Sequence, residues 1–131
     1  MAHPPADVPG GPLDDQLGDP RVVHAIGAEE WAAAGEAVRP PSLESEGFIH
    51  LSTPSQIAWV CDQRYADRDD LVLLVVHPDD LPIDLVWEDC EEVGQDFPHL
   101  YAPLPRTAVQ AVLDYRPGPD GRYPPPELPT R

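Results

Sequence analysis

Three histidines stand in segments that are otherwise apolar or aromatic, and they are the first candidates for chemistry. His50 interrupts the run GFIHL, His24 interrupts RVVHAI, and His99 lies at the centre of FPHLY. A neutral imidazole donates a hydrogen bond through one nitrogen and accepts through the other, so it serves as a general acid or base or binds ligand hydroxyls. A single such histidine more often braces the fold through a hydrogen bond. Three of them in similar settings favour a shared cleft.

Hydroxyl and carboxylate groups accompany these histidines. Ser52 lies two residues after His50, so both side chains point to the same face of an extended strand. Thr53 followed by Pro54 is typical of a helix start, where a hydroxyl caps free N–H groups and where anions also bind. Ser52 and Thr53 therefore serve equally well as helix caps or as ligand contacts. Glu88 ends a short apolar segment, where a solvated strand end is the plainer interpretation.

The charge composition restricts the partners of this chain. Among 131 residues there are 24 Asp and Glu but only 8 Lys and Arg, which gives a formal net charge of -16. Such a field repels nucleic acids and anionic membrane surfaces. An anionic small molecule would need a local arginine to overcome it. The composition therefore favours a small-molecule ligand over a polyanion.

The length predicts one domain with terminal extensions. We expect an extended or disordered leader over residues 1–20, a folded domain over 21–115 and a proline-rich tail over 116–131. The leader lacks the apolar core of a signal peptide, and no apolar run is long enough to span a bilayer. Cys61 and Cys90 have neither metal-binding nor redox spacing. These features predict a cytoplasmic protein with reduced thiols.

Apolar runs and turn residues predict the elements that must position the polar groups. The strand predictions are residues 21–26, 47–51, 71–76, 85–88 and 108–115, of which the last also fits a helix. The helix predictions are residues 28–36 and 54–65, and the loop predictions are 38–46, 91–96 and a tight turn around His99. Short helices among several strands predict an α+β domain with a curved or split, mixed or antiparallel β-sheet and two to three short helices.

Four of these segments together resemble a known family. The runs VVHAI, EGFIHLS, DLVLL and FPHLY occur here in the order seen in a small bacterial family, domain of unknown function 952. The resemblance covers residues 21–115. The family is in turn distantly similar to the ADP-ribosyltransferase-like fold, closest to the group of the RNA 2'-phosphotransferases, which bind NAD in the cleft of a split β-sheet.

This second resemblance implies roles for individual residues. His24 is similar to the polar group of the first strand, and His50 and Ser52 to those of the second. Groups at these places hold the ribose and nicotinamide of NAD in that fold. We therefore expect His24, Ser52 and the adjacent Thr53 to bind the cofactor, and His50 to act with the catalytic groups. The third polar group, which orients the attacking atom, would be Glu88 or His99.

This sequence also departs from the pattern of the RNA 2'-phosphotransferases, and three functional classes therefore stay open. The separated arginines that the phosphotransferases use on phosphates are missing, although Arg39, Arg64 and Arg106 offer other anion contacts. We prefer a protein that binds, and in the enzymatic case transforms, NAD or a related small nucleotide. A metal site built from His24, His50 and His99 with hydrolytic activity is the second class. A non-catalytic interaction or regulatory domain is the third.

Overall fold

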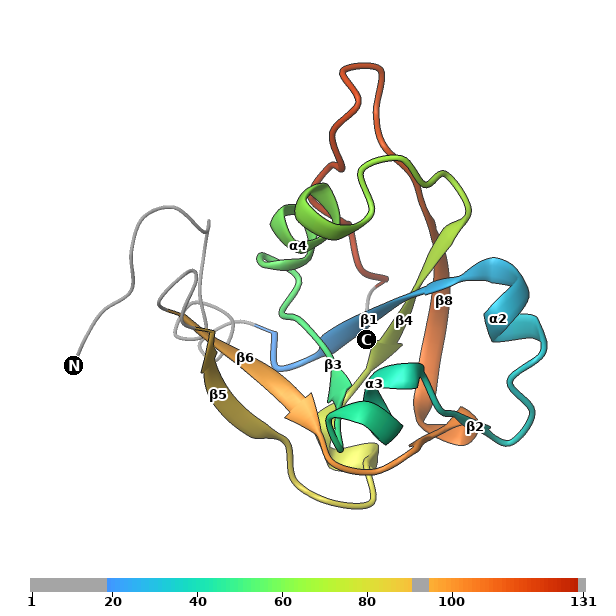
Figure 1. Ribbon diagram of the computed structural model, residues 1–131, viewed down its shortest axis with the longest axis vertical. Helices are drawn as coiled ribbons and strands as arrows, with labels where there is room; N and C mark the ends of the chain where they lie inside the picture. The colour runs from blue at the N-terminus through green and yellow to red at the C-terminus, as the bar shows by residue number, and fades with distance from the viewer. Residues whose placement is uncertain (1–18, 91–94, 130–131) are drawn as a thin grey trace.

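The computed structural model describes residues 19–90 and 95–129, which form eight strands and three short α-helices (Figure 1). The strands are β1 (Val22–Gly27), β2 (Ala37–Val38), β3 (Ile49–His50), β4 (Leu71–Val76), β5 (Val86–Cys90), β6 (Gln95–Leu100), β7 (Leu104–Pro105) and β8 (Val109–Tyr115). The helices are α2 (Ala28–Ala32), α3 (Pro41–Ser45) and α4 (Ile57–Arg64), and single 3-10 turns occupy Pro78–Asp80 and Arg106–Ala108. The predicted α+β class with few short helices is confirmed. The sequence predicted one curved or split, mixed or antiparallel sheet, whereas the described strands form three antiparallel sheets.

The central sheet has the order β1-β4-β8 and is antiparallel throughout. All six residues of β4 are buried, as expected for the apolar run 71–76. Side chains alternate along the strands, so each face of this sheet forms its own core. One core, the α4 core, contains Val23, Ile57, Cys61, Leu71, Leu73, Val75, Tyr115 and Tyr123. The other, the β3 core, contains Val22, Val38, Ile49, Leu51, Val72, Leu74, Val76, Leu100, Leu104 and Ala108.

A second sheet with the order β3-β6-β5 lies to one side of the central sheet (Figure 1). An isolated antiparallel bridge between Val23 and Ser52 pairs it with the central sheet. The N–H of each residue donates to the carbonyl of the other, at 2.8 and 2.9 Å. The segment from β3 to Ser52 therefore pairs with β6 at its start and with β1 at its end. A two-stranded sheet of β2 and β7 closes the β3 core at its edge.

Several predicted boundaries are wrong for local reasons. The helix expected over 28–36 ends at Ala32, and the chain then turns at Gly35, whose φ of +73° suits glycine. The segment 38–46 is not only a loop, because Pro41 is the first residue of α3, a position where a missing N–H is harmless.

Two further predictions fail close to the histidines. The helix expected over 54–65 begins at Ile57, because the carbonyl and hydroxyl oxygens of Thr53 accept hydrogen bonds from the Gln56 N–H and form a turn first. His99 lies inside β6, not in a tight turn. Asp96 also belongs to β6, while positions 91–94 of the predicted acidic loop lie outside the described residues, as do positions 1–18 of the predicted leader.

The described part of the proline-rich tail packs against α4. Tyr123 is 4% exposed, and its N–H donates to Asp62 at 2.8 Å. Its hydroxyl donates to the carbonyls of Tyr65 and Arg68, both at 2.8 Å. Tyr123 thus fixes the last turn of α4 from behind. None of the helices in the described ranges is long and apolar enough to cross a membrane.

Candidate functional site

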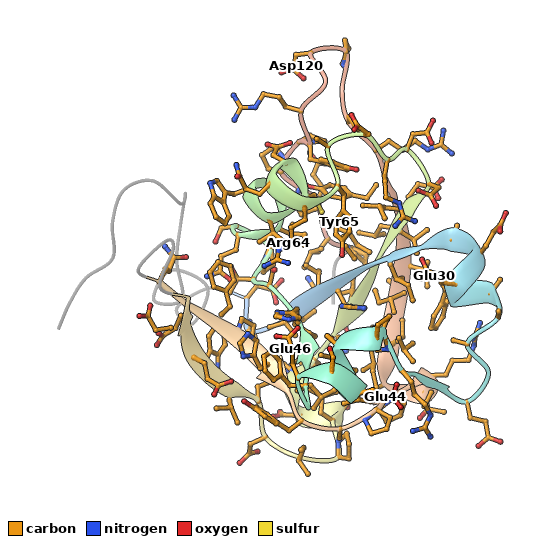
Figure 2. The ribbon with its side chains drawn as sticks, in the orientation of Figure 1. Glu30, Glu44, Glu46, Arg64, Tyr65 and Asp120 are labelled. Carbon is orange, nitrogen blue, oxygen red and sulfur yellow. The ribbon has the colours of Figure 1, made fainter. Side chains whose placement is uncertain are left out.

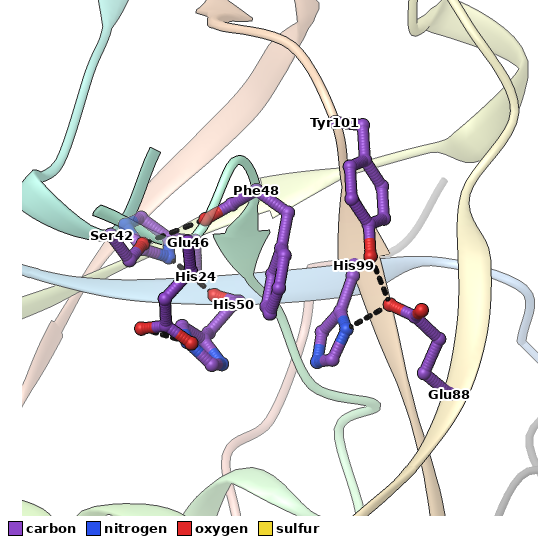
Figure 3. Close-up of polar contacts among 8 residues, drawn as sticks. All are labelled: His24, Ser42, Glu46, Phe48, His50, Glu88, His99 and Tyr101. Atoms are coloured by element: carbon purple, nitrogen blue, oxygen red, sulfur yellow. Dashed lines mark hydrogen bonds and ion pairs between the residues drawn. The ribbon is translucent and has the colours of Figure 1, made fainter. Parts of the chain in front are cut away.

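Strand pairing places two of the three histidines side by side. His50 of β3 is directly opposite His99 of β6, so both side chains leave the same face of the second sheet. Their ring centroids lie 5.2 Å apart at an angle of 76°. Phe48 stacks on His99 at 4.1 Å and meets His50 edge-on at 4.9 Å, and Figure 3 shows it between the two imidazoles. The three rings form one aromatic cluster at the surface of the sheet.

A carboxylate orients His99 (Figure 3). Oε1 of Glu88 accepts a hydrogen bond from Nδ1 of His99 at 2.6 Å and another from the hydroxyl of Tyr101 at 2.7 Å. These two bonds lower the pKa of Glu88, and the bond from Tyr101 is the larger cause. The same bond is the main cause that raises the pKa of Tyr101. Because Nδ1 carries the proton, Nε2 of neutral His99 can act as a hydrogen-bond acceptor. That arrangement suits a general base.

His24 has a different environment. It is 7% exposed, and its Nδ1 donates to the carbonyl oxygen of His50 at 2.8 Å. Burial is the main cause that lowers its pKa, against the opposing effect of this hydrogen bond. His24 is therefore neutral at physiological pH and joins β1 to β3.

His50 is more accessible, with a side chain that is 41% exposed. Its Nε2 contacts Oε2 of Glu46 at 3.3 Å, and the Glu46 side chain is 49% exposed. Partial burial lowers the pKa of His50, while the contact with Glu46 opposes this effect. A long contact between two half-exposed groups holds the ring only weakly. His50 therefore contributes less to the fold than His24 does.

All three histidines line one cavity of about 1270 Å³. Its walls include the aromatic rings of Trp59 and Phe97, and Arg39 and Arg64 add positive charge. The volume exceeds the roughly 300–1,000 Å³ of ordinary small-molecule sites. The cavity thus combines apolar walls with a few polar groups, the usual character of a ligand site.

The structure groups most of the predicted site residues around this cavity. Ser52 lines it together with His24, His50 and His99. Ser52 is also buried, at 4% exposure, and its backbone forms the bridge to β1. Thr53 is not among the lining residues: it is 1% exposed, and its hydroxyl caps the turn before α4. The structure thus gives Thr53 a capping position.

Glu88 lies behind His99 and outside the lining of the cavity. Its carboxylate contacts the cavity residue His99. The adjacent Asp89 does line the cavity. Of the two candidates for the third polar group, His99 therefore faces the cavity and Glu88 supports it.

The sequence reasoning missed the partners of the histidines. Phe48 precedes His50 by two residues, and Tyr101 follows His99 by two, so a period of two would have placed each on the same face as its histidine. The sequence prediction treated Glu46 as part of the chain leading into the strand, and its contact with His50 depends on the turn between α3 and β3. Of the predicted anion contacts, Arg106 lies over Trp31, 3.9 Å from the ring centroid, and does not line the cavity.

The three-histidine metal site finds no support in this geometry. Within residues 19–90 and 95–129, no group of three or more His, Cys, Asp or Glu side chains is arranged to hold a metal ion. Nδ1 of His24 is occupied by a backbone carbonyl, and the rings of His50 and His99 meet edge to face. The imidazoles share a cavity without directing their nitrogens at one point.

Comparisons with known proteins now identify the family. The crystal structure of protein CC0527 from Caulobacter crescentus is 31% identical to this chain, covers 79% of it and 93% of its own chain, and has a TM-score of 0.71. The solution NMR structure of the same protein is 30% identical, covers 78% and 90%, and has a TM-score of 0.64. A search of the curated proteins gives no match. These comparisons do not show the predicted likeness to the ADP-ribosyltransferase-like fold, which stays a prediction. Residues 25–112 match the family described as "Protein of unknown function (DUF952)", and the chain belongs to that family.

Proposed function

We propose that this protein binds NAD or a related small nucleotide in the histidine-lined cavity, with His99 as its acid–base group. The observation that carries the proposal is the different environment of each imidazole around one cavity. His24 is buried and neutral, His50 is half-exposed, and Nδ1 of His99 donates to Glu88. Ribose hydroxyls need such a mixture of donors and acceptors.

Two further features support a nucleotide-like ligand. Trp59, which packs against the buried Phe97 in the wall of the cavity, offers aromatic surface on which a base or a nicotinamide ring would stack. The cavity volume is ample for a ligand of that size. The net charge of -16 disfavours a large RNA and leaves a compact ligand as the better fit.

The transferase reaction implied by the family resemblance assigns His99 a specific task. Its Nε2 would accept the proton of an attacking hydroxyl while that oxygen bonds to the ribose carbon and nicotinamide leaves with the bonding electrons. Glu88 would stabilise the imidazolium that forms, as a carboxylate behind a catalytic histidine does.

Ligand titration tests the proposal. Saturation-transfer NMR and calorimetry with NAD, ADP-ribose and AMP should detect binding, and His50→Ala and His99→Ala should weaken it at least tenfold, the effect of losing roughly one hydrogen bond to a charged or polar ligand group. His77→Ala is the matched control, because His77 caps a surface 3-10 turn. Absence of binding at millimolar ligand would overturn the proposal.

The same variants test the third functional class. If the histidines only brace an interaction domain, His50→Ala should lower the melting temperature strongly and leave no ligand effect. The weak, half-exposed contact of His50 with Glu46 favours the opposite result, which is near-native stability with weakened binding.

A further inference from the structure

Arginines gather at the cavity of this acidic protein. The chain has 8 basic residues, all of them arginine, and three line the cavity: Arg39, Arg64 and Arg68. Arg68 is neutralised, since its guanidinium lies 2.7 Å from Asp70 and 3.6 Å from Glu30. No ion pair within residues 19–90 and 95–129 involves Arg39 or Arg64. Two positive charges thus face the cavity without a neutralising carboxylate from the described chain.

Arg64, the last residue of α4, lines the same cavity as His50 and Glu46. In the view of Figure 2 the labels of Arg64 and Glu46 lie on either side of β1. The positive charge of Arg64 also contributes to lowering the pKa of His50. Guanidinium and imidazole together provide several N–H donors for one anionic group.

The contact between His50 and Glu46 shows where a competing anion would bind. Oε2 of Glu46 lies 3.3 Å from Nε2 of His50, beyond the 2.7–2.9 Å range typical of charge-assisted hydrogen bonds. Both side chains are 41–49% exposed, so water screens the interaction. A ligand oxyanion that also contacts Arg64 would bind His50 more favourably than Glu46 does.

We propose that Arg64 and His50 hold a phosphate-class anionic group of the ligand, which takes the place of the Glu46 carboxylate at Nε2 of His50. The inference rests on the proposed function and deepens it, because it says which part of a nucleotide lies at this end of the cavity. It places the phosphates between α4 and β3. An aromatic ring of the ligand then lies toward Trp59.

Titration with inorganic pyrophosphate at low ionic strength tests this site. Arg64→Gln should weaken binding about tenfold or more, the effect of losing roughly one charge-assisted hydrogen bond. Glu46→Gln should tighten binding severalfold, because it removes the competing carboxylate. Arg116→Gln is the matched control, since Arg116 is exposed and does not line the cavity. Imidazole nitrogen shifts followed by NMR should move at His50 and stay unchanged at His77.

Equal pyrophosphate affinity in Arg64→Gln and wild type would overturn the anion site, and so would weaker binding in Glu46→Gln. The failure of this inference differs from the failure of the proposed function. If NAD binds equally well to wild type and Arg64→Gln, the nucleotide site stands and its phosphates lie elsewhere. If pyrophosphate binds through Arg64 but no nucleotide does, the anion site stands and the nucleotide proposal is wrong. Circular dichroism of each variant confirms that the fold is intact.

Discussion

The central sheet and the β3-β6-β5 sheet of this protein are held together by different kinds of interaction. In the central sheet, β1 and β4 pair over six residues, and every side chain of β4 is buried between two apolar cores. In the other sheet, β3 has only two residues, and the face that carries His50 and His99 is aromatic, polar and partly open to solvent. Apolar packing holds the first sheet, whereas individual hydrogen bonds to named partners hold the side chains of the second.

This difference separates stability from function within a small domain. β1 belongs to both regions, because Val23 enters the α4 core while the adjacent His24 bonds to the backbone of His50. The strand is thus a rigid base from which one side chain reaches the site. Sites built on rigid strands keep their groups in place more precisely than sites built on loops.

The largest effect is expected from shortening an apolar side chain of the central sheet. Leu74→Ala, at a fully buried position of β4, should lower the free energy of unfolding by roughly 2–5 kcal/mol through lost burial and the cavity left behind. His50→Ala should change it by about 1 kcal/mol or less, as half-exposed positions do. Urea denaturation of both variants measures the contrast. Equal losses would mean that the site face is as structural as the core.

A smaller effect is expected where the chain enters β3. Gly47 has a φ of +91°, and a Cβ there would meet no atom within 4 Å, so its replacement strains only the backbone. Gly47→Ala should lower the free energy of unfolding by roughly 1–2 kcal/mol. Gly118→Ala is the control, because Gly118 has no positive φ and a Cβ there would make only ordinary contacts. Similar thermal shifts in both variants would contradict the strain argument.

Acid should destabilise the fold through the histidines, because burial lowers the pKa of His24 and of His50 below 6.5. The unfolded chain takes up these protons near pH 6.5, and the folded protein only at lower pH. The unfolded state therefore binds more protons, so the stability present above pH 6.5 is lost as the pH falls below it. Urea denaturation from neutral to mildly acidic pH should show this slope, and His24→Gln should reduce it. An unchanged slope in the variant would assign the effect to other groups.

The smallest effect on stability is expected when Glu88, the hydrogen-bond partner of His99, is replaced. The effect on the tautomer of His99 should nevertheless be clear in its imidazole ¹⁵N shifts. Neutral His99 should carry its proton on Nδ1, which donates to Glu88. Neutral His77 should carry its proton on Nε2, because its Nδ1 accepts from the N–H of Asp79. Imidazole ¹⁵N shifts distinguish the two tautomers within one sample. Glu88→Ala removes this acceptor, so it should abolish the preference of His99 and leave His77 unchanged. An unchanged His99 tautomer in this variant would remove the oriented base from the proposed site.

The two sheets also differ in how far the sequence predicts them. The strand at 71–76 followed from its unbroken apolar run, and the strand that contains His24 followed in the same way, because burial on both faces leaves a local pattern. The pairing of Glu88 with His99 leaves no such pattern, since it depends on the register between β5 and β6. Helix α3 was not predicted, for another reason. Pro40 and Pro41 suggested a loop, although proline is compatible with the first helical position that Pro41 occupies.

The site residues show the same division. His24, His50, Ser52 and His99 became candidates because polar side chains stand out in or beside apolar runs. Thr53 also stood out, but its hydroxyl serves the turn before α4. Side-chain type therefore identified the candidates, and only the tertiary contacts separated cavity groups from caps.

Tyr123, near the end of the described chain, holds α4 in place. Its N–H and hydroxyl make three hydrogen bonds, to Asp62 within the helix and to the carbonyls of Tyr65 and Arg68 just beyond it. The helix that carries Arg64 is thus held from the rear by a residue far along the sequence. A protein shortened ahead of Tyr123 would keep every residue that lines the cavity but lose these bonds to α4, so we expect such a deletion to weaken the proposed anion binding by Arg64.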